Sequence, residues 1–412
     1  MSYNLDRLLA RFLKYVQFDT GANESSETYP SSNNQLALGK ALVEELRAIG
    51  LKDAVQTPFG VVYATIPASI SDSRSEPVIG FCAHLDTSPD VPTGPVKPQV
   101  IRSYQIGDIA LPADSSKKIL VSENPELLCM EGMTIITADG TTLLGADDKT
   151  GVAILVELAA HLSEHLEIPH GKIRLCFTPD EEIGHGTDHI DLAEFGCDFC
   201  YTLDSSGVDG LDVETFSADA AAIRFTGNNI HPSIGKGRLI NAIRAAGVFV
   251  DLLPFQGLSP ETTDGREGFI HPVSLDATVE SATLKLILRS FETSALTGYR
   301  DLLTDLVARI KQAFPGLKID LSFTEQYRNM RDGLIKDPRA VDRAEAALRS
   351  LGRSAERQIV RGGTDGSRLT EMGLPTPNLT SGQHTPHSYL EWACLQEMAG
   401  TLDWTVAIVR VQ

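Results

Sequence analysis

Four short apolar runs constrain the fold of this chain most strongly, because each has the length of one buried β-strand. They are VVYATI at residues 61–66, VIGFCA at 78–83, IRLCF at 173–177 and FCYTL at 199–203. Between the second and third runs, GVAILVELAAHL at 151–162 has the pattern of a helix. Strands that alternate with helices predict an α/β fold, in which a mixed but mostly parallel sheet is covered on both faces.

Two further helices precede these strands. Residues 5–16 place their leucines and phenylalanine on one face, and Asn4 is a suitable N-cap. A second helix is expected to end at Ile49, where Gly50 suits the C-terminal stop.

The pattern of expected strands and helices changes near Phe216. The next hundred or so residues predict a β-α-β-α-β block, a small α+β module of the ferredoxin-like kind. After Tyr327 the α/β pattern of the first part returns. We therefore expect one domain made of residues 1–215 and 327–412, interrupted by an inserted domain at 216–326.

The segment from Thr87 to Gly140 does not follow the alternation of strands and helices. It carries four early prolines, and its apolar residues are scattered. We interpret it as a long insertion over one end of the sheet, and loops of this length are often functional.

Composition excludes several classes of function. With 36 Lys and Arg against 55 Asp and Glu, the net charge of −19 leaves no basic surplus for nucleic acid or an anionic membrane. No apolar stretch approaches the roughly 18 residues of a membrane span, and the charged N-terminus lacks the features of a signal peptide. We expect a cytoplasmic protein with reduced thiols, in which Cys197 and Cys200 are two half-buried residues rather than a redox pair.

Acidic residues and a histidine gather where the predicted strands end. His84 and Asp86 follow the run at 78–83, Asp180–Glu182 follow 173–177, and Asp204 follows 199–203. Asp147 and Asp148 directly precede the helix at 151–162. Ligands of open α/β sheets bind at this edge. Clustered carboxylates repel one another, and one or two divalent metal ions would remove the conflict.

Spacing adds detail to this hypothesis, although each motif alone has a simpler interpretation. In an extended segment His84 and Asp86 point the same way, so His84 can bind a metal while Asp86 holds its other ring nitrogen. Alternatively, His84 is a hydrogen-bonded histidine without a metal. Glu181 and Glu182 cannot both face one metal, which favours one ligand and one general base; alternatively, they form a solvated acidic loop.

Five motifs carry a resemblance to a known family. GTTLLGADDKTG (140–151), FTPDEEIG (177–184), GNNIHPSIGKGRLINA (227–242), RGGTDGSRL (361–369) and SGQHTPHSYLEW (381–392) resemble the peptidase T branch of the di-zinc exopeptidases. That family also holds carboxypeptidase G, dipeptidases and aminoacylase. The similarity spans nearly the whole chain, including the inserted domain.

The resemblance implies a di-zinc exopeptidase fold with two Zn²⁺ per subunit. His84, Asp147 and Asp204 would hold one zinc, and Asp147, Glu182 and His387 the other, with Asp147 bridging. Glu181 would be the general base and Asp86 the carboxylate that orients His84. Asp148 is expected to face solvent or cap the helix.

The second histidine ligand has two candidates, His384 and His387. Glu391 lies four residues after His387, which matches the family spacing, so we expect His387 to be the ligand and His384 a neighbour.

The inserted domain is expected to act as a lid and dimerisation domain. In the homodimer that this implies, His231 would reach the active site of the partner subunit and stabilise the oxyanion. Asn241, Arg289 and Arg361 would contact the carbonyl or carboxylate of a small peptide. Without the resemblance, His231 is a surface histidine and Arg289 a surface ion-pair residue.

The implied activity is release of the N-terminal residue of tripeptides by a zinc-activated water, with Glu181 as the base. A related dipeptidase or N-acyl amino acid deacylase would use the same metals. A catalytically silent peptide-binding protein is the third alternative. Zinc, cobalt and manganese all accept such ligands, so the sequence leaves the native metal open.

Overall fold

Contacts divide the chain into two compact units in the computed structural model, which describes residues 3–71 and 76–411. Unit 1 comprises the residues up to Val213, Met330–Gln358 and the residues from Thr364 onward. Unit 2 comprises Glu214–Asn329 and Ile359–Gly363. The short segment 359–363 therefore packs with unit 2, whereas the expected boundaries assign all of residues 327–412 to the other domain.

A mixed sheet forms the centre of unit 1. Its strand order is β1-β2-β8-β3-β9-β16-β17-β7-β4, and β10 pairs with both β15 and β16. The strands are β1 Val55–Gln56, β2 Val62–Ile66, β3 Ile79–His84, β4 Gln99–Ile101, β7 Ile135–Thr137, β8 Ile173–Thr178, β9 Phe199–Ser206, β10 Gly210–Thr215, β15 Glu356–Val360, β16 Asn378–His384 and β17 Trp392–Cys394. The parallel pairs are β8–β3, β3–β9 and β9–β16, and the outer pairs are antiparallel. The α/β class is confirmed, but parallel pairing is restricted to the centre of the sheet.

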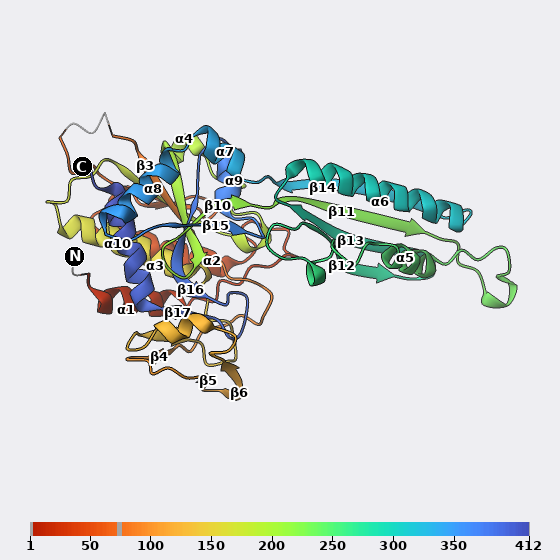
Figure 1. Cartoon of the computed structure of the whole chain (residues 1–412), viewed down its shortest axis with the longest axis horizontal. Helices are drawn as coiled ribbons and strands as arrows, with labels where there is room; N and C mark the ends of the chain where they lie inside the picture. Colours follow the sequence, from red (N-terminus) through yellow and green to blue (C-terminus); the bar gives the residue numbers. More distant parts are fainter. Residues whose placement is uncertain (1–2, 72–75, 412) are drawn as a thin grey trace. The chain divides into compact units, whose positions relative to one another are not determined.

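Helices cover both faces of this sheet (Figure 1). They are α1 Leu5–Tyr15, α2 Asn33–Ile49, α3 Ala146–Glu164, α4 Leu192–Phe195, α7 Arg331–Lys336, α8 Arg339–Ser350, α9 Asp365–Glu371 and α10 Leu395–Val409. Helix α3 packs directly on β3, β9 and β16, and α1 and α10 pack on α3. Because α3 is covered on all sides, its residues from Ala146 to Leu162 are buried, and it shows no polar face.

The expected start of the first helix and the expected end of the second are confirmed. The Asn4 side chain accepts a hydrogen bond from the backbone N–H of Arg7 at the start of α1. Gly50 ends α2 with φ of 118°, a left-handed conformation that favours glycine.

The segment from Thr87 to Gly140 is more ordered than a loop. Its strands β4 and β7 extend the central sheet, and β5 (Ile109–Leu111) pairs with β6 (Asp114–Ile119) as a separate two-stranded sheet. Tyr104 and Leu127 of the segment belong to an apolar cluster that also contains Trp392 of β17. Strands of three residues among prolines leave too little pattern to be predicted from sequence.

Unit 2 is a four-stranded antiparallel sheet with two helices on one face (Figure 1). Its elements are β11 Ser217–Thr226, α5 Ala242–Asp251, β12 Phe269–Ala277, β13 Ser281–Ser290, α6 Thr293–Ala313 and β14 Lys318–Tyr327, with strand order β12-β13-β11-β14. This β-α-β-β-α-β order is ferredoxin-like, as expected. Strand β12 was not predicted, because Pro272 interrupts its pattern at a register shift and its end is exposed.

Within residues 3–71 and 76–411, no helix combines the length and the apolar character that crossing a membrane requires.

Candidate metal centre and active site

The predicted site residues of unit 1 lie at one edge of the central sheet. His84 is the last residue of β3, and Asp204 lies near the end of β9. Glu181 and Glu182 form the short 3-10 helix η2 (Glu181–Ile183) after β8, and His387 lies in the loop after β16. Because these strands are neighbours and run parallel, their carboxyl ends meet.

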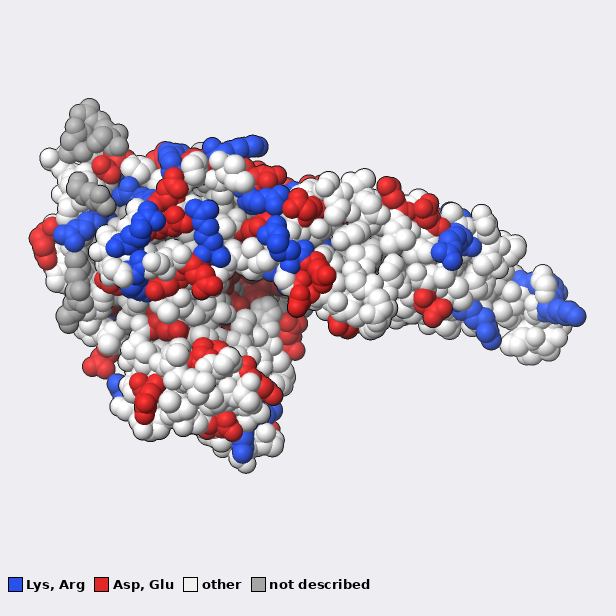
Figure 2. Space-filling view, viewed as in Figure 1, with Lys and Arg blue, Asp and Glu red and all other residues white. Residues whose placement is uncertain are grey.

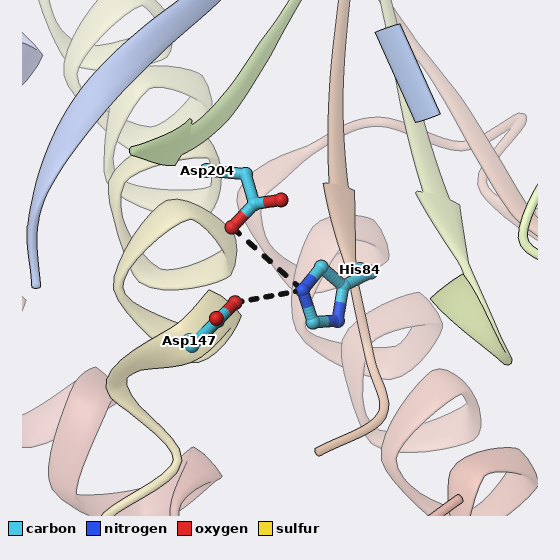
Figure 3. Close-up of side chains that lie close together, drawn as sticks. All are labelled: His84, Asp147 and Asp204. Carbon is cyan, nitrogen blue, oxygen red and sulfur yellow. Dashed lines mark hydrogen bonds and ion pairs between the residues drawn. The ribbon is translucent and has the colours of Figure 1, made fainter. Parts of the chain in front are cut away.

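The first group of donors is His84, Asp147 and Asp204, whose side chains point toward one another in Figure 3. Nε2 of His84 lies 2.9 Å from Oδ1 of Asp147 and 3.8 Å from Oδ1 of Asp204. Asp147 is in the first turn of α3, so helix α3 and strands β3 and β9 each contribute one ligand atom.

The second group is Asp147, Glu182 and His387. Nε2 of His387 lies 2.8 Å from Oε2 of Glu182 and 3.4 Å from Oδ2 of Asp147. Asp147 therefore turns one oxygen to each histidine, which is the arrangement of a carboxylate shared by two metal ions.

One buried oxygen tests whether cations fit this site. Oε1 of Glu182 is buried and has no hydrogen-bond partner within the described part of the chain, although buried carboxylate oxygens are normally paired. Two histidines with carboxylates form a donor set that Zn²⁺ accepts. The residues present therefore fit two divalent cations, with Asp147 common to both.

The pKa shifts of the side chains in the two donor groups also indicate that the site favours added positive charge. Burial raises the pKa of Asp204 well above its usual range and the pKa of Glu182 to about 7. Burial disfavours the charged forms of His84 and His387, but the carboxylates around them outweigh it and raise the pKa of His387 to about 11. Protons thus offset the negative charge, and bound cations would displace them.

Asp86 holds three parts of the site together. Its Oδ1 lies 3.3 Å from Nδ1 of His84, as the spacing predicted, and also accepts the backbone N–H of Glu181 at 3.0 Å. Its Oδ2 accepts the N–H of Glu182, also at 3.0 Å. Asp86 therefore orients the imidazole and fixes the backbone of both glutamates. Burial raises the pKa of the neighbouring Glu181 well above its usual range.

Of the two expectations for Asp148, exposure to solvent is wrong and capping of the helix is confirmed. It is fully buried, and its carboxylate accepts the backbone N–H groups of His84 at 3.1 Å and Gly151 at 3.2 Å. It caps the start of the regular part of α3 and also ties that helix to the end of β3. The peptide bond between Asp147 and Asp148 is cis.

Glu391 is a site residue that the sequence indicated only as a spacing marker. Its buried carboxylate accepts the backbone N–H groups of Leu144, Gly145 and Asp147 at 2.7–2.9 Å. Three donors fix the turn that presents Asp147, and burial raises the pKa of Glu391 to about 7. The contact joins residues 244 or more positions apart, which no local pattern reveals.

The two candidate histidines after β16 have different surroundings. His384 is buried, stacks on Trp392 with ring centroids 3.7 Å apart, and its Nε2 lies 2.6 Å from Glu397. His387 joins Asp147 and Glu182. The structure therefore brings His387 to the donor groups and places His384 against other partners. Gln383 approaches the site as well, with Nε2 at 3.3 Å from Oδ1 of Asp204.

The four expected substrate-contacting residues all belong to unit 2. His231 is exposed and accepts the N–H of Ser233, and Asn241 caps α5 by accepting the N–H of Arg244. Arg289 of β13 donates to Oε1 of Gln326 at 2.9 Å.

Arg361, itself part of unit 2, donates to other residues of that unit from both terminal nitrogens of its guanidinium. It donates to the carbonyl oxygens of Gly265 and Glu267 at 2.9 Å and lies over the ring of Phe216. The backbone packs closely nearby, since a Cβ on Gly363 would lie 2.5 Å from the Tyr327 ring.

Comparison with known proteins agrees with this fold. The model of peptidase family M20/M25/M40 matches residues 139–407. Peptidase T of Geobacillus kaustophilus is 40% identical over 406 residues, and peptidase T of Clostridium botulinum strain 657 is 38% identical over 404 residues. In both cases 98% of each chain is covered.

Solved structures show the same fold. A tripeptidase from Staphylococcus aureus superposes with a TM-score of 0.76 at 23% identity, and aminopeptidase PepT from Bacillus cereus with 0.74 at 22%. Each match covers 99% of this chain and 98% of the other. A Bacillus subtilis protein described as a dinuclear metal-binding peptidase gives a TM-score of 0.65 at 16% identity, with coverage of 98% and 97%.

Fold, shared aspartate and family match together define a metallopeptidase. The chain belongs to peptidase family M20/M25/M40, and within it to the branch of the peptidase T enzymes.

Proposed function

We propose that the chain is an aminopeptidase that releases the N-terminal residue of tripeptides. The observation that carries this proposal is Asp147, which offers one carboxylate oxygen to each of two donor groups at the sheet edge. Its peptidase T relatives, and the structures described as an aminopeptidase and a tripeptidase, support the substrate class.

Two Zn²⁺ ions per subunit are the proposed cofactors, and the donor set also admits cobalt or manganese. His84, Asp147 and Asp204 would hold one ion, and Asp147, Glu182 and His387 the other. When bound, such ions polarise the scissile carbonyl and lower the pKa of a water molecule toward neutrality.

Glu181 moves the proton in the proposed reaction. Its carboxylate takes a proton from the attacking water as the oxygen bonds to the scissile carbonyl carbon. It then gives that proton to the leaving amine as the C–N bond breaks, so the base is regenerated. Asp86 keeps Glu181 in place through the backbone N–H bond, and burial suits a carboxyl that must both accept and donate.

Unit 2 would complete the site in a homodimer. In this part of the proposal, His231 of the partner subunit stabilises the developing oxyanion, while Asn241, Arg289 and Arg361 bind the carbonyl or carboxylate of the peptide. The residue types support these roles, because guanidinium groups bind carboxylates through paired hydrogen bonds. Such an enzyme would act on small peptides in the cytoplasm.

A substrate panel tests the activity. The zinc-loaded protein is assayed on tripeptides, dipeptides and N-acetyl amino acids, with and without a chelator. We expect tripeptides to be cleaved at the first peptide bond, and chelation to abolish turnover. Preference for dipeptides or N-acetyl amino acids would assign the chain to a dipeptidase or deacylase. Absence of any cleavage with zinc bound would favour a silent peptide-binding protein.

A further inference from the structure

The loop that carries His387 is held in an unfavourable backbone conformation. It runs from Thr385 to Glu391 between β16 and β17, and both Thr385 and His387 have positive φ, at 52° and 58°. Outside glycine such conformations are unfavourable and persist only where the surroundings hold them. The contacts that hold this loop therefore decide where Nε2 of His387 points.

The Thr87–Gly140 insertion clamps both ends of the loop through one side chain. Asn124 is buried, and its Oδ1 accepts hydrogen bonds from Oγ1 of Thr385 at 2.9 Å and from Nε1 of Trp392 at 3.2 Å. Its Nδ2 donates to the carbonyl oxygen of Leu120 at 3.1 Å, which fixes the amide within the insertion. Trp392 is fully buried in the apolar cluster that it shares with residues of the insertion.

A second contact from the insertion reaches the imidazole itself. Oδ2 of Asp90 lies 3.1 Å from Nδ1 of His387, while Nε2 of the same ring faces Glu182 and Asp147. The arrangement is similar to that of His84, whose Nδ1 lies 3.1 Å from the carbonyl oxygen and 3.3 Å from Oδ1 of Asp86 while its Nε2 faces Asp147. A carboxylate on one ring nitrogen fixes the tautomer and makes the other nitrogen a better ligand.

We propose that Asp90 and Asn124 are positioning residues for His387, and that fixing this ligand is a function of the 87–140 insertion. Asn124 fixes the path of the loop backbone. Asp90 holds Nδ1 of His387, so that the lone pair of Nε2 points toward Glu182 and Asp147, the other members of the second donor group. The inference rests on the proposed two-metal site. It assigns to the insertion a role in metal binding.

The test measures binding of Zn²⁺ alone to the metal-free, full-length protein by competition with a chromogenic chelator. Asp90 is suited to substitution, because its side chain is 64% exposed and its loss leaves no cavity. The variants are Asp90→Ala, Asp90→Asn and Asn124→Ala. The matched control is Glu123→Ala, which removes an exposed carboxylate from the same insertion.

We expect the unmodified chain and the control to bind two equivalents of Zn²⁺. Asp90→Ala should weaken one equivalent about 10- to 100-fold and leave the other unchanged, and the thermal midpoint of the metal-free protein should stay the same. Asp90→Asn, which keeps an acceptor oxygen, should restore part of that affinity. Asn124→Ala should weaken the same equivalent, and in both alanine variants kcat should fall more than KM rises.

Two results would overturn different parts of this account. If Asp90→Ala binds both equivalents as tightly as the unmodified chain, the positioning role is wrong and the proposed activity is untouched. If the unmodified chain itself binds fewer than two equivalents, the two-metal site fails, and the inference fails with it.

Discussion

At the scale of single residues, three buried carboxylates of this site bind backbone N–H groups rather than belonging to the donor groups. Asp86 accepts the N–H groups of Glu181 and Glu182, and Asp148 accepts that of His84. Glu391 does the same for Asp147. Four of the six candidate residues, the base and three of the five ligands, thus have their main chain fixed by an acid that is not itself in the donor groups. Such support gives the preorganisation that metal binding and proton transfer require.

Glu181 provides the sharpest prediction at this scale. Glu181→Gln removes the proton acceptor but keeps the size of the side chain and the N–H that Asp86 binds. We expect kcat to fall by about 10²- to 10⁴-fold, the usual contribution of general acid–base catalysis, while both metal equivalents stay bound. Turnover and metal content are measured on the same preparation. Near-normal turnover with full metal content would show that another group is the base.

At the scale of elements, sequence pattern was sufficient wherever a segment is long and uniformly apolar or periodic. The strands at 78–83 and 173–177 and the helix at 151–162 are present as expected, and they alone predict the edge where His84, Glu181 and Asp147 gather. The resemblance then supplied the choice of ligands. Local sequence pattern therefore predicts the parts of the site that lie at the ends of strands.

The remaining parts of the site depend on contacts between distant segments. The Asp90–His387 contact spans 297 positions, and neither residue carries a local signal of the other. Asp148 follows Asp147 and resembles an ordinary exposed helix cap, yet the close packing of α3 on β3 buries it. Only the assembled sheet determines which of two adjacent acids faces the donor groups.

A buried carboxyl at the pairing of β10 with β16 predicts that the free energy of unfolding depends on pH. Asp212 lies opposite Asn378, which donates to its Oδ2 at 2.8 Å, and burial raises the pKa of Asp212 to about 6. The folded chain therefore binds this proton more tightly than the unfolded chain, and stability is lost as the pH rises from about 4 through 6. The loss levels off within about one pH unit above 6.

Asp212→Asn cannot titrate and removes this dependence. Between pH 5 and pH 7.5 the free energy of unfolding of the original chain should fall by about 1–1.5 kcal/mol relative to the variant. Urea denaturation of the metal-free proteins at both pH values measures the difference. The control is Asp320→Asn, an exposed carboxylate on β14, which should change both values equally. An equal response of Asp212→Asn would show that this carboxyl titrates normally.

At the scale of the whole molecule, exposed negative charge is spread over the surface, whereas buried negative charge is concentrated at the two donor groups. The chain carries a net charge of −19, and on the face seen in Figure 2 basic side chains lie among the acidic ones. Exposed charges of this kind are screened by water and salt, whereas the acids around His84 and His387 are mostly buried. A bound cation should therefore stabilise one unit selectively.

Metal removal should affect unit 1 and leave unit 2 unchanged. Both donor groups found in the described residues lie in unit 1, whereas unit 2 has an apolar core of its own between its sheet and α5 and α6. A ligand present at 1,000 times its Kd stabilises the state that binds it by about 4 kcal/mol, so the zinc-free chain loses stability of this order around the site.

Hydrogen exchange measured with and without a chelator locates the loss. We expect faster exchange at the ends of β3 and β9, in η2 and in the first turns of α3, with β11–β14 unchanged, and readdition of Zn²⁺ should restore the protection. Equal acceleration in both units would mean that the ions stabilise the chain globally, and no acceleration at η2 would remove Glu182 from the ligand set.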